Sequence, residues 1–205
     1  MILGDPYKFG IITQNIKDWN EKDSLFNNGV LMICIDGAIY PDEVYTATLS
    51  REIGILKKQL MNINENEQIF FMEKERAFKY IYEVTYPSDI NIDNDYSYDI
   101  TPDTISDRHC KIFSVCYENK VRFLGGRRKK DENRYDIREA YVSLEVVEKI
   151  AMELWNDVIE KNHYILIICF KIYISKYILL IYIPIIVCIH EIDFILIDTT
   201  VCIYC

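Results

Sequence analysis

Histidine is scarce in this chain of 205 residues: there are three, and His109 is the only one before His163. A catalytic or metal-binding cluster that needs two histidines therefore cannot be assembled from the first 162 residues. The sequence also lacks the motifs of nucleophilic hydrolases, zinc proteases and phosphate-binding loops. His109 and Cys110 are neighbours, and neighbours along a strand point to opposite faces. We therefore expect no enzymatic activity, no metal and no cofactor.

Basic residues are outnumbered, with 23 Lys and Arg against 32 Asp and Glu and a net charge of -9. An acidic balance speaks against a nucleic-acid partner and against an anionic membrane surface. It is compatible with a basic protein partner, although an acidic charge alone does not require one.

From Tyr80 to Asp107 there are seven acidic residues and no Lys or Arg. Carboxylates steer the encounter with a basic surface, and rigid aromatic side chains anchor it. If this segment is an exposed loop, it belongs to the partner-binding face. The residues expected to contact the partner are Asp93, Asp95, Tyr96, Tyr98, Asp99 and Asp103.

The stretch from Asp93 to Asp99 resembles the start of a calcium-binding loop but lacks two of its defining residues. Tyr98 stands where such a loop needs a turn glycine, and Thr104 stands where it needs a closing bidentate glutamate. A solvated acidic loop or a loop that faces a partner is the better interpretation.

Residues 163–205 contain no Gly, Ala, Arg, Asn, Gln, Met or Trp, whereas residues 1–162 have an ordinary globular composition. We therefore place a boundary at Asn162, between an α+β domain and a hydrophobic tail rich in Ile, Tyr and Cys. Three interpretations of the tail remain open: a membrane segment, buried β-strands, and a frame-shifted or read-through product.

The membrane interpretation places residues 164–190 in the inner membrane. Its uncharged core, from Tyr177 to His190, is shorter than the roughly 20 residues that span a bilayer. Extending it takes in Lys171 and Lys176, which are unfavourable near the bilayer centre. Strands are compatible with the β-branched and aromatic residues of the tail. The composition favours the third interpretation, because AT-rich codons read in the wrong frame give these residues.

Apolar periodicity in residues 1–162 predicts an α+β fold, with a mostly antiparallel sheet and about three helices packed on it. Strands are expected at 9–13, 30–35, 38–40, 44–49, 111–117, 121–124 and 137–142, and helices at 50–61, 72–84 and 144–160. Asp36 and Gly37 between two apolar runs predict a two-residue turn with positive φ. Residues 62–68 and 88–107 are expected to be irregular, and Gly125 is expected to end a strand.

Several motifs carry a family resemblance through their order and spacing. They are Gly4-Asp5-Pro6-Tyr7-Lys8-Phe9, Trp19, the run from Gly29 through the hairpin to Tyr40-Pro41, Thr85-Tyr86-Pro87, and Val121-Arg122-Phe123-Leu124-Gly125-Gly126-Arg127. Together they resemble the immunity protein 42 family of bacterial polymorphic-toxin systems. The resemblance covers about Met1 to Glu160 and leaves out the tail, which strengthens the frame-shift interpretation.

The resemblance implies a non-catalytic α+β protein that acts in the cytoplasm by binding and blocking a cognate toxin domain. Many toxin domains of this class act on nucleic acids and carry basic clefts, which an acidic inhibitor can cover. The resemblance supplies no toxin-contact residues. We expect structural roles for the residues Gly4, Asp5, Pro6, Trp19, Gly37, Tyr40, Pro41, Pro87, Gly125 and Gly126.

Two functions remain open at this point: a toxin-neutralising immunity protein, and a membrane-anchored accessory protein whose tail is a genuine anchor. The absence of a basic and apolar leader at the N-terminus favours a cytoplasmic location. A membrane partner is expected only if the tail is genuine.

The tail gives a first testable prediction. A chain that ends at Asn162 should unfold cooperatively and be more soluble than the full chain, because a large exposed apolar segment promotes association. Thermal unfolding and size-exclusion chromatography of both chains measure this. An insoluble or molten truncated chain would instead favour a tail that completes the core.

Overall fold

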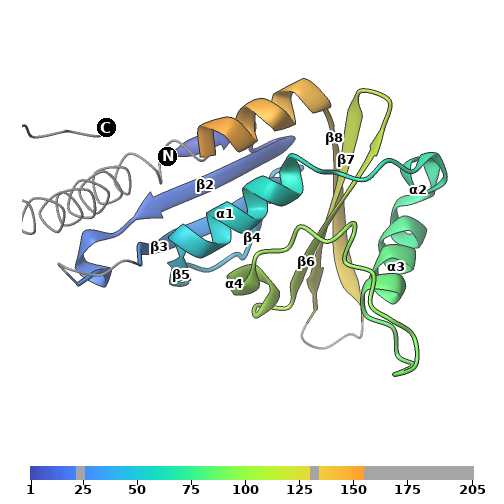
Figure 1. Cartoon of the computed structure of the whole chain (residues 1–205), viewed down its shortest axis with the longest axis horizontal. Coiled ribbons are helices and arrows are strands. Elements are labelled where there is room, and N and C mark those ends of the chain that lie inside the picture. The colour runs from blue at the N-terminus through green and yellow to red at the C-terminus, as the bar shows by residue number, and fades with distance from the viewer. Residues whose placement is uncertain (22–25, 130–133, 155–205) are drawn as a thin grey trace, which may run out of the picture. The chain divides into compact units, whose positions relative to one another are not determined.

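The computed structural model describes residues 1–21, 26–129 and 134–154, which belong to one compact unit, Met1–Val158 (Figure 1). The predicted tail, Trp155 and the predicted end of the last helix lie outside these residues. Within the described part of the chain, no helix is both long enough and apolar enough to cross a membrane.

The N-terminal half forms a five-stranded antiparallel sheet with the strand order β1-β2-β3-β4 (Figure 1). Strand β5 pairs with the start of β3 and lies off this path. The strands are β1 (Ile2–Gly4), β2 (Phe9–Asn15), β3 (Asn28–Ile35), β4 (Ala38–Tyr40) and β5 (Ala47–Thr48). Of the predicted strand 44–49, only Ala47 and Thr48 are extended in a sheet, and Leu49 begins α1 (Leu49–Leu60).

The predicted turn between β3 and β4 is present, with φ of 51° at Asp36 and 75° at Gly37. A second turn, near the N-terminus, is hydrogen-bonded to the turn between β3 and β4. The backbone N–H of Asp36 donates to the carbonyl of Lys8, and that of Gly37 donates to the carbonyl of Pro6, each at 3.0 Å. The turn therefore holds the Gly4-Asp5-Pro6 region against the end of the sheet.

The C-terminal half forms a second antiparallel sheet with the order β6-β7-β8. Its strands are β6 (Cys110–Tyr117), β7 (Lys120–Arg128) and β8 (Tyr135–Ser143). The α+β class and the antiparallel pairing are confirmed, but the strands divide into two sheets rather than one. The reason is that the outer edge of β6 is occupied: its backbone bonds with Asn64, Asn66, Tyr98 and Ile100 instead of with a strand of the first sheet.

The helices pack on different faces of the sheets, whereas the sequence predicted one sheet with the helices packed on it. They are η1 (Lys17–Trp19), α1 (Leu49–Leu60), α2 (Glu67–Phe71), α3 (Lys74–Thr85), α4 (Asp103–Ser106) and a last helix described for residues 144–154. The prediction of irregular chain was wrong for α2 and α4. The side chain of Asn66 caps α2 by accepting from the N–H of Ile69, a signal that the sequence does contain.

Two apolar clusters lie on opposite faces of the second sheet. The first joins α1, the 144–154 helix and the first sheet to one face, where the rings of Phe9 and Phe123 stack with centroids 3.7 Å apart. The second lies between the other face and the helices α2 and α3, and includes Phe78, Phe113 and Leu124. Helix α3 is thus held by a small core of its own.

The glycine pair Gly125 and Gly126 does not end a strand, because β7 continues to Arg128. Both glycines are buried, and each admits an aromatic side chain. A Cβ on Gly125 would lie 2.7 Å from Tyr40 Cε2, and one on Gly126 would collide with Phe78 Cζ. The glycines therefore permit the two clusters to pack closely on the two faces of one strand.

A Gly126→Ala variant tests this packing. Overpacking a filled core costs about 1–3 kcal/mol, so the free energy of unfolding should fall by that amount. Adding Phe78→Leu should restore part of the loss, because it removes the atoms that the new methyl group meets. Chemical denaturation of the two single variants and the double variant measures the coupling, and strictly additive effects would contradict this account.

Candidate partner-binding surface

The predicted acidic segment follows α3 and folds back along β6 (Figure 1). Helix α3 ends at Thr85, two residues before Pro87, as expected from the geometry of the residue that precedes a proline. Side chains then tie the segment to the helix end: Asn94 Nδ2 donates to the carbonyl of Thr85 at 2.8 Å. The backbone N–H of Asp95 donates to the carbonyl of Val84 at 2.9 Å. These bonds satisfy carbonyls that a helix terminus leaves without partners.

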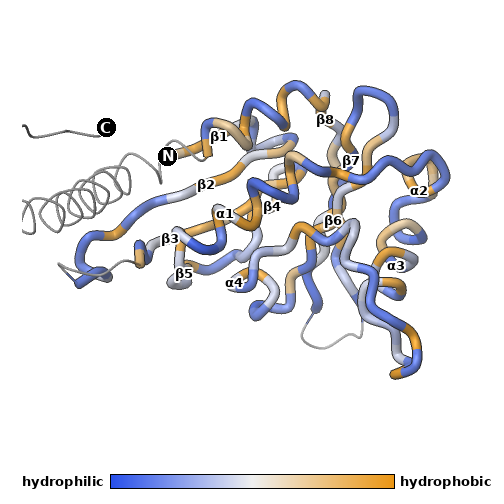
Figure 2. Tube along the Cα trace, viewed as in Figure 1, coloured by the Kyte–Doolittle hydropathy of each residue, from blue (hydrophilic) through white to orange (hydrophobic). Residues whose placement is uncertain are grey.

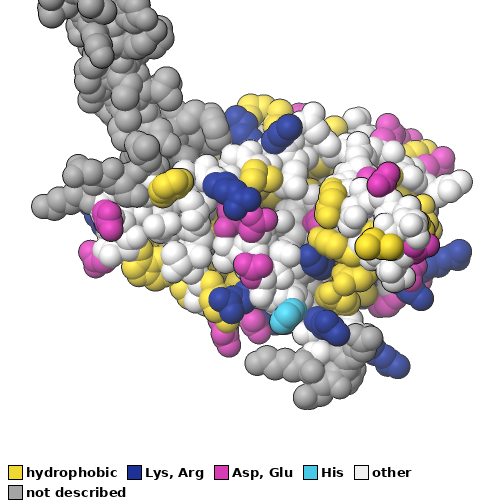
Figure 3. Space-filling model, turned by 60° about the horizontal axis from the view of Figure 1, so that its bottom comes forward, with side chains coloured by type: hydrophobic (Ala, Val, Ile, Leu, Met, Phe, Trp, Pro, Cys, Tyr) yellow, Lys and Arg dark blue, Asp and Glu magenta, His cyan; other side chains and the backbone are white. Residues whose placement is uncertain are grey.

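Residues 88–96, which we call the 88–96 segment, place acidic and apolar side chains together in solvent. Asp89, Asp93 and Asp95 are exposed. Ile90 is 97% exposed, Ile92 57% and Tyr96 58%. Figure 2 shows an apolar tip within this hydrophilic segment, and Figure 3 shows hydrophobic and acidic side chains side by side over α3 and the chain that follows it.

The two isoleucines were missed by the sequence analysis, which treated the segment as acidic and aromatic. Their signal is the alternation Asp89-Ile90-Asn91-Ile92-Asp93, which is typical of a strand but occurs where no strand forms. Isolated exposed apolar residues are common, but here Ile90, Ile92 and Tyr96 are exposed together on one short segment.

The expectation that the whole segment is exposed was wrong for Tyr98 and Asp99. Tyr98 is half-buried in the second apolar cluster, and Asp99 is only 8% exposed. The reason is that this part of the chain bridges to β6, opposite Phe113. Asp103 lies on α4, where it forms an ion pair with Arg51 at 2.7 Å. Of the six predicted residues, only Asp93, Asp95 and Tyr96 lie within one short exposed stretch.

A polar cluster beneath the segment explains why Asp99 is buried. Asp99 Oδ2 accepts a hydrogen bond from the Tyr86 hydroxyl at 2.5 Å, and its Oδ1 accepts from the N–H of Thr101 at 2.8 Å. Lys111 Nζ donates to the Tyr86 hydroxyl at 2.8 Å and to Ser106 Oγ at 2.7 Å. The hydroxyl of Tyr86 thus stands between a carboxylate and an ammonium group.

Burial shifts the acid–base properties of this cluster. Desolvation raises the pKa of Tyr86, and the hydrogen bond to Asp99 raises it further, so the phenol keeps its proton at neutral pH. Desolvation lowers the pKa of Lys111, although the charges of Asp99 and Asp107 oppose this. The cluster is a structural anchor that joins the end of α3, residues 99–101 and β6.

No group of three His, Cys, Asp or Glu side chains in residues 1–21, 26–129 and 134–154 is placed to hold a metal ion. The three cysteines of this part of the chain, Cys34, Cys110 and Cys116, are free and buried. Burial raises the pKa of each thiol, which makes all three poor nucleophiles.

A core of two antiparallel sheets carries this exposed acidic and apolar segment. The family model of Immunity protein 42 matches residues 1–157, and the chain belongs to this family. The predicted family is thereby confirmed. Immunity proteins are typically non-catalytic, in agreement with the expectation of a binding protein rather than an enzyme. The match ends before the predicted tail.

A solved structure supports the fold. The chain is similar to the crystal structure of CdiI from Burkholderia dolosa AUO158, with 21% identity and a TM-score of 0.64. The similarity covers 77% of this chain and 99% of that one. At 21% identity, this similarity shows only that the two proteins share a fold. No curated protein matches the chain.

A Tyr86→Phe variant tests the anchor. Removing the hydroxyl leaves Asp99 and Lys111 with unsatisfied hydrogen-bonding groups, which should lower the free energy of unfolding by about 1–3 kcal/mol. Amide hydrogen exchange should also accelerate in residues 95–99. Tyr96→Phe is the matched control, since no hydrogen bond is found for the exposed Tyr96 hydroxyl within the described residues. Equal stability of the two variants would refute the anchor.

Proposed function

We propose that this protein binds and neutralises a cognate toxin domain, and that the 88–96 segment forms part of the contact surface. The observation that carries the proposal is the combination of three exposed carboxylates with Ile90, Ile92 and Tyr96 on a segment without Lys or Arg. Membership of an immunity protein family supports a toxin as the partner.

The charges and the apolar side chains of the segment have different roles in this proposal. Carboxylates at the rim of an interface mainly accelerate association with a basic partner. Apolar and aromatic side chains that become fully buried mainly slow dissociation. A partner with a basic cleft, such as a toxin that acts on nucleic acid, fits such a surface.

The proposal places this action in the cytoplasm. The free cysteines of the described residues are compatible with a reducing compartment. The alternative, a membrane-anchored accessory protein, depends on residues 163–205, which lie outside the described part of the chain. The match of the family model to residues 1–157 favours the toxin-binding function.

The charges are tested by replacing Asp93 and Asp95 with Asn and measuring association with the cognate toxin domain. The association rate should fall about three- to tenfold at low ionic strength, and the difference should shrink at high salt, where charges are screened. Asp99 is left unchanged because it belongs to the core. The matched control removes two exposed charges elsewhere, with Asp18→Asn on η1 and Glu145→Gln on the 144–154 helix.

The apolar tip is tested in the same assay with Ile90→Ala. Loss of a buried anchor should raise the dissociation rate about tenfold and leave the association rate almost unchanged. Ile55→Ala on α1, another exposed isoleucine, is the control. If both the charge variant and Ile90→Ala bind like the unmodified protein at every salt concentration, the contact surface lies elsewhere.

A further inference from the structure

Strand β8 is an outer strand of the second sheet, and its outer edge is nine residues long. In an antiparallel pair, alternate residues direct their backbone N–H and carbonyl groups away from the partner strand. Within the described residues, no hydrogen bond is found for these outward groups of Tyr135–Ser143. The opposite edge of the sheet, on β6, is bonded to the backbone of Asn64, Asn66, Tyr98 and Ile100. In this part of the chain, one edge of the sheet is therefore closed and the other is open.

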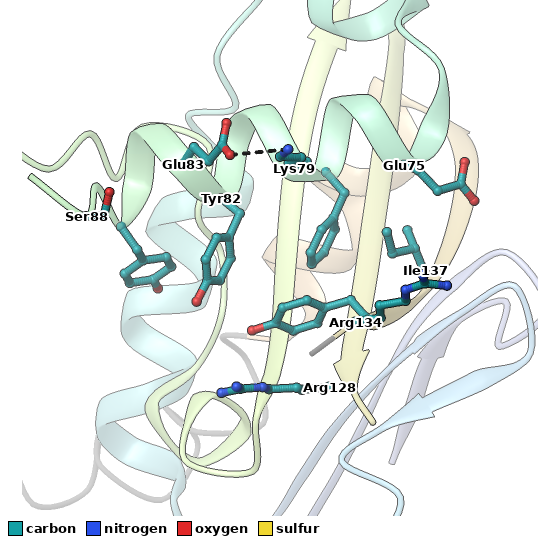
Figure 4. A pocket seen from close by; sticks show the side chains of 11 residues that line it. Glu75, Lys79, Tyr82, Glu83, Ser88, Arg128, Arg134 and Ile137 are labelled. Atoms are coloured by element: carbon teal, nitrogen blue, oxygen red, sulfur yellow. Dashed lines mark ion pairs between the residues drawn. The ribbon is translucent and has the colours of Figure 1, made fainter. Parts of the chain in front are cut away.

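A cavity of about 590 Å³ lies beside β8, between this strand and α3 (Figure 4). Tyr135 and Ile137 line it from β8, and Phe78, Tyr82 and Tyr86 line it from α3 and the residue that follows. All of these residues except Phe78 are only partly buried, so the apolar lining is accessible from solvent. Side chains of a strand alternate between the two faces of a sheet. Every second side chain of a strand added to β8 would therefore lie on the face that carries the cavity.

The cavity is continuous with the 88–96 segment. Ser88, the first residue of that segment, is part of the lining (Figure 4). Ring contacts extend the connection: the centroid of Tyr96 lies 6.0 Å from that of Tyr86, which lies 5.2 Å from that of Tyr82. The centroid of Tyr82 lies 5.5 Å from that of Tyr135 on β8. An aromatic surface thus leads from the 88–96 segment to the edge strand.

Charge selects between two kinds of chain that could pair with this edge, a second copy of this protein and a segment of a basic partner. Asp89, Asp93 and Asp95 are exposed on the segment that adjoins the cavity, and this segment contains no Lys or Arg. A second copy would bring a chain with a net charge of -9 towards these carboxylates, which like charges disfavour. A basic chain is attracted to the same carboxylates, so the charges favour a basic partner.

We propose that an extended segment of the basic toxin partner adds to the outer edge of β8 as a fourth strand of the second sheet. Its backbone bonds to the outward N–H and carbonyl groups of β8, and alternate apolar side chains enter the cavity beside Tyr82 and Ile137. Its basic side chains lie at the end nearest the 88–96 segment. In strand addition, backbone bonds give affinity and side-chain pockets give specificity. This binding mode rests on the proposed toxin-binding function and specifies which kind of toxin segment is bound.

Amide hydrogen exchange of the full chain, free and bound to the cognate toxin domain, tests the proposal residue by residue. In the free protein, the amides of β8 that bond to β7 should exchange slowly and the alternate amides should exchange fast. In the complex, exchange of these alternate amides within Tyr135–Ser143 should slow by at least about tenfold, because they gain hydrogen bonds to the added strand. Amides of the 88–96 segment should slow as well.

The outcomes separate strand addition from toxin binding itself. Protection of the 88–96 segment without protection of the alternate β8 amides would overturn strand addition and leave the proposed function intact. Absence of any complex would overturn both. Protection of the alternate amides already in the free protein, together with a dimer in size-exclusion chromatography, would identify a second copy as the occupant and would also overturn the proposal.

Ile137→Ala tests the contribution of the cavity, with Val142→Ala as the matched control. Both residues are partly buried in β8, but Ile137 packs against the second apolar cluster and Val142 against the first. Both variants should lower the thermal stability, whereas only Ile137→Ala should raise the dissociation rate of the toxin domain, by about tenfold. An equal rise in both variants would trace the effect to stability. That result, or an unchanged rate for Ile137→Ala, would overturn the role of the cavity.

Discussion

The buried guanidinium group of Arg122 is the interaction on which the second half of the structure depends. Arg122 lies in the central strand β7 and is only 1% exposed. Its Nη1 donates to the carbonyls of Ile69, Phe70 and Met72 at 3.0, 3.0 and 2.7 Å. Its Nε and Nη2 donate to Glu139 Oε2 at 3.0 and 2.7 Å. A buried charge is tolerated only when it is paired and hydrogen-bonded in this way.

The consequence of Arg122 extends to the proposed contact surface. A helix of five residues such as α2 has too few internal bonds to be stable alone, and Arg122 satisfies the carbonyls at its end. The last of these carbonyls belongs to Met72, so the start of α3 at Lys74 is fixed over the sheet. The far end of α3 then carries the 88–96 segment.

Local features of the fold could be predicted from the sequence, and long-range ones could not. The turn at Asp36 and Gly37 and the end of α3 before Pro87 follow from the backbone preferences of single residues. The division into two sheets depends on which segment occupies the edge of β6. The burial of Asp99 depends on Tyr86 and Lys111, and the space at Gly126 depends on Phe78. No local pattern records such contacts between distant residues.

Hydrogen bonds from aspartate side chains restrict the backbone of the 88–96 segment. Asp89 Oδ1 accepts from the N–H of Asn91, and Asp95 Oδ1 accepts from the N–H of Ser97, each at 2.9 Å. These bonds restrict the backbone before a partner arrives, so less conformational entropy is lost on binding. The same carboxylates place negative charge beside Ile90, which disfavours association between copies of this acidic protein. Asp89 and Asp95 therefore shape the segment, and in the proposed function their charges also limit which partner can cover its apolar tip.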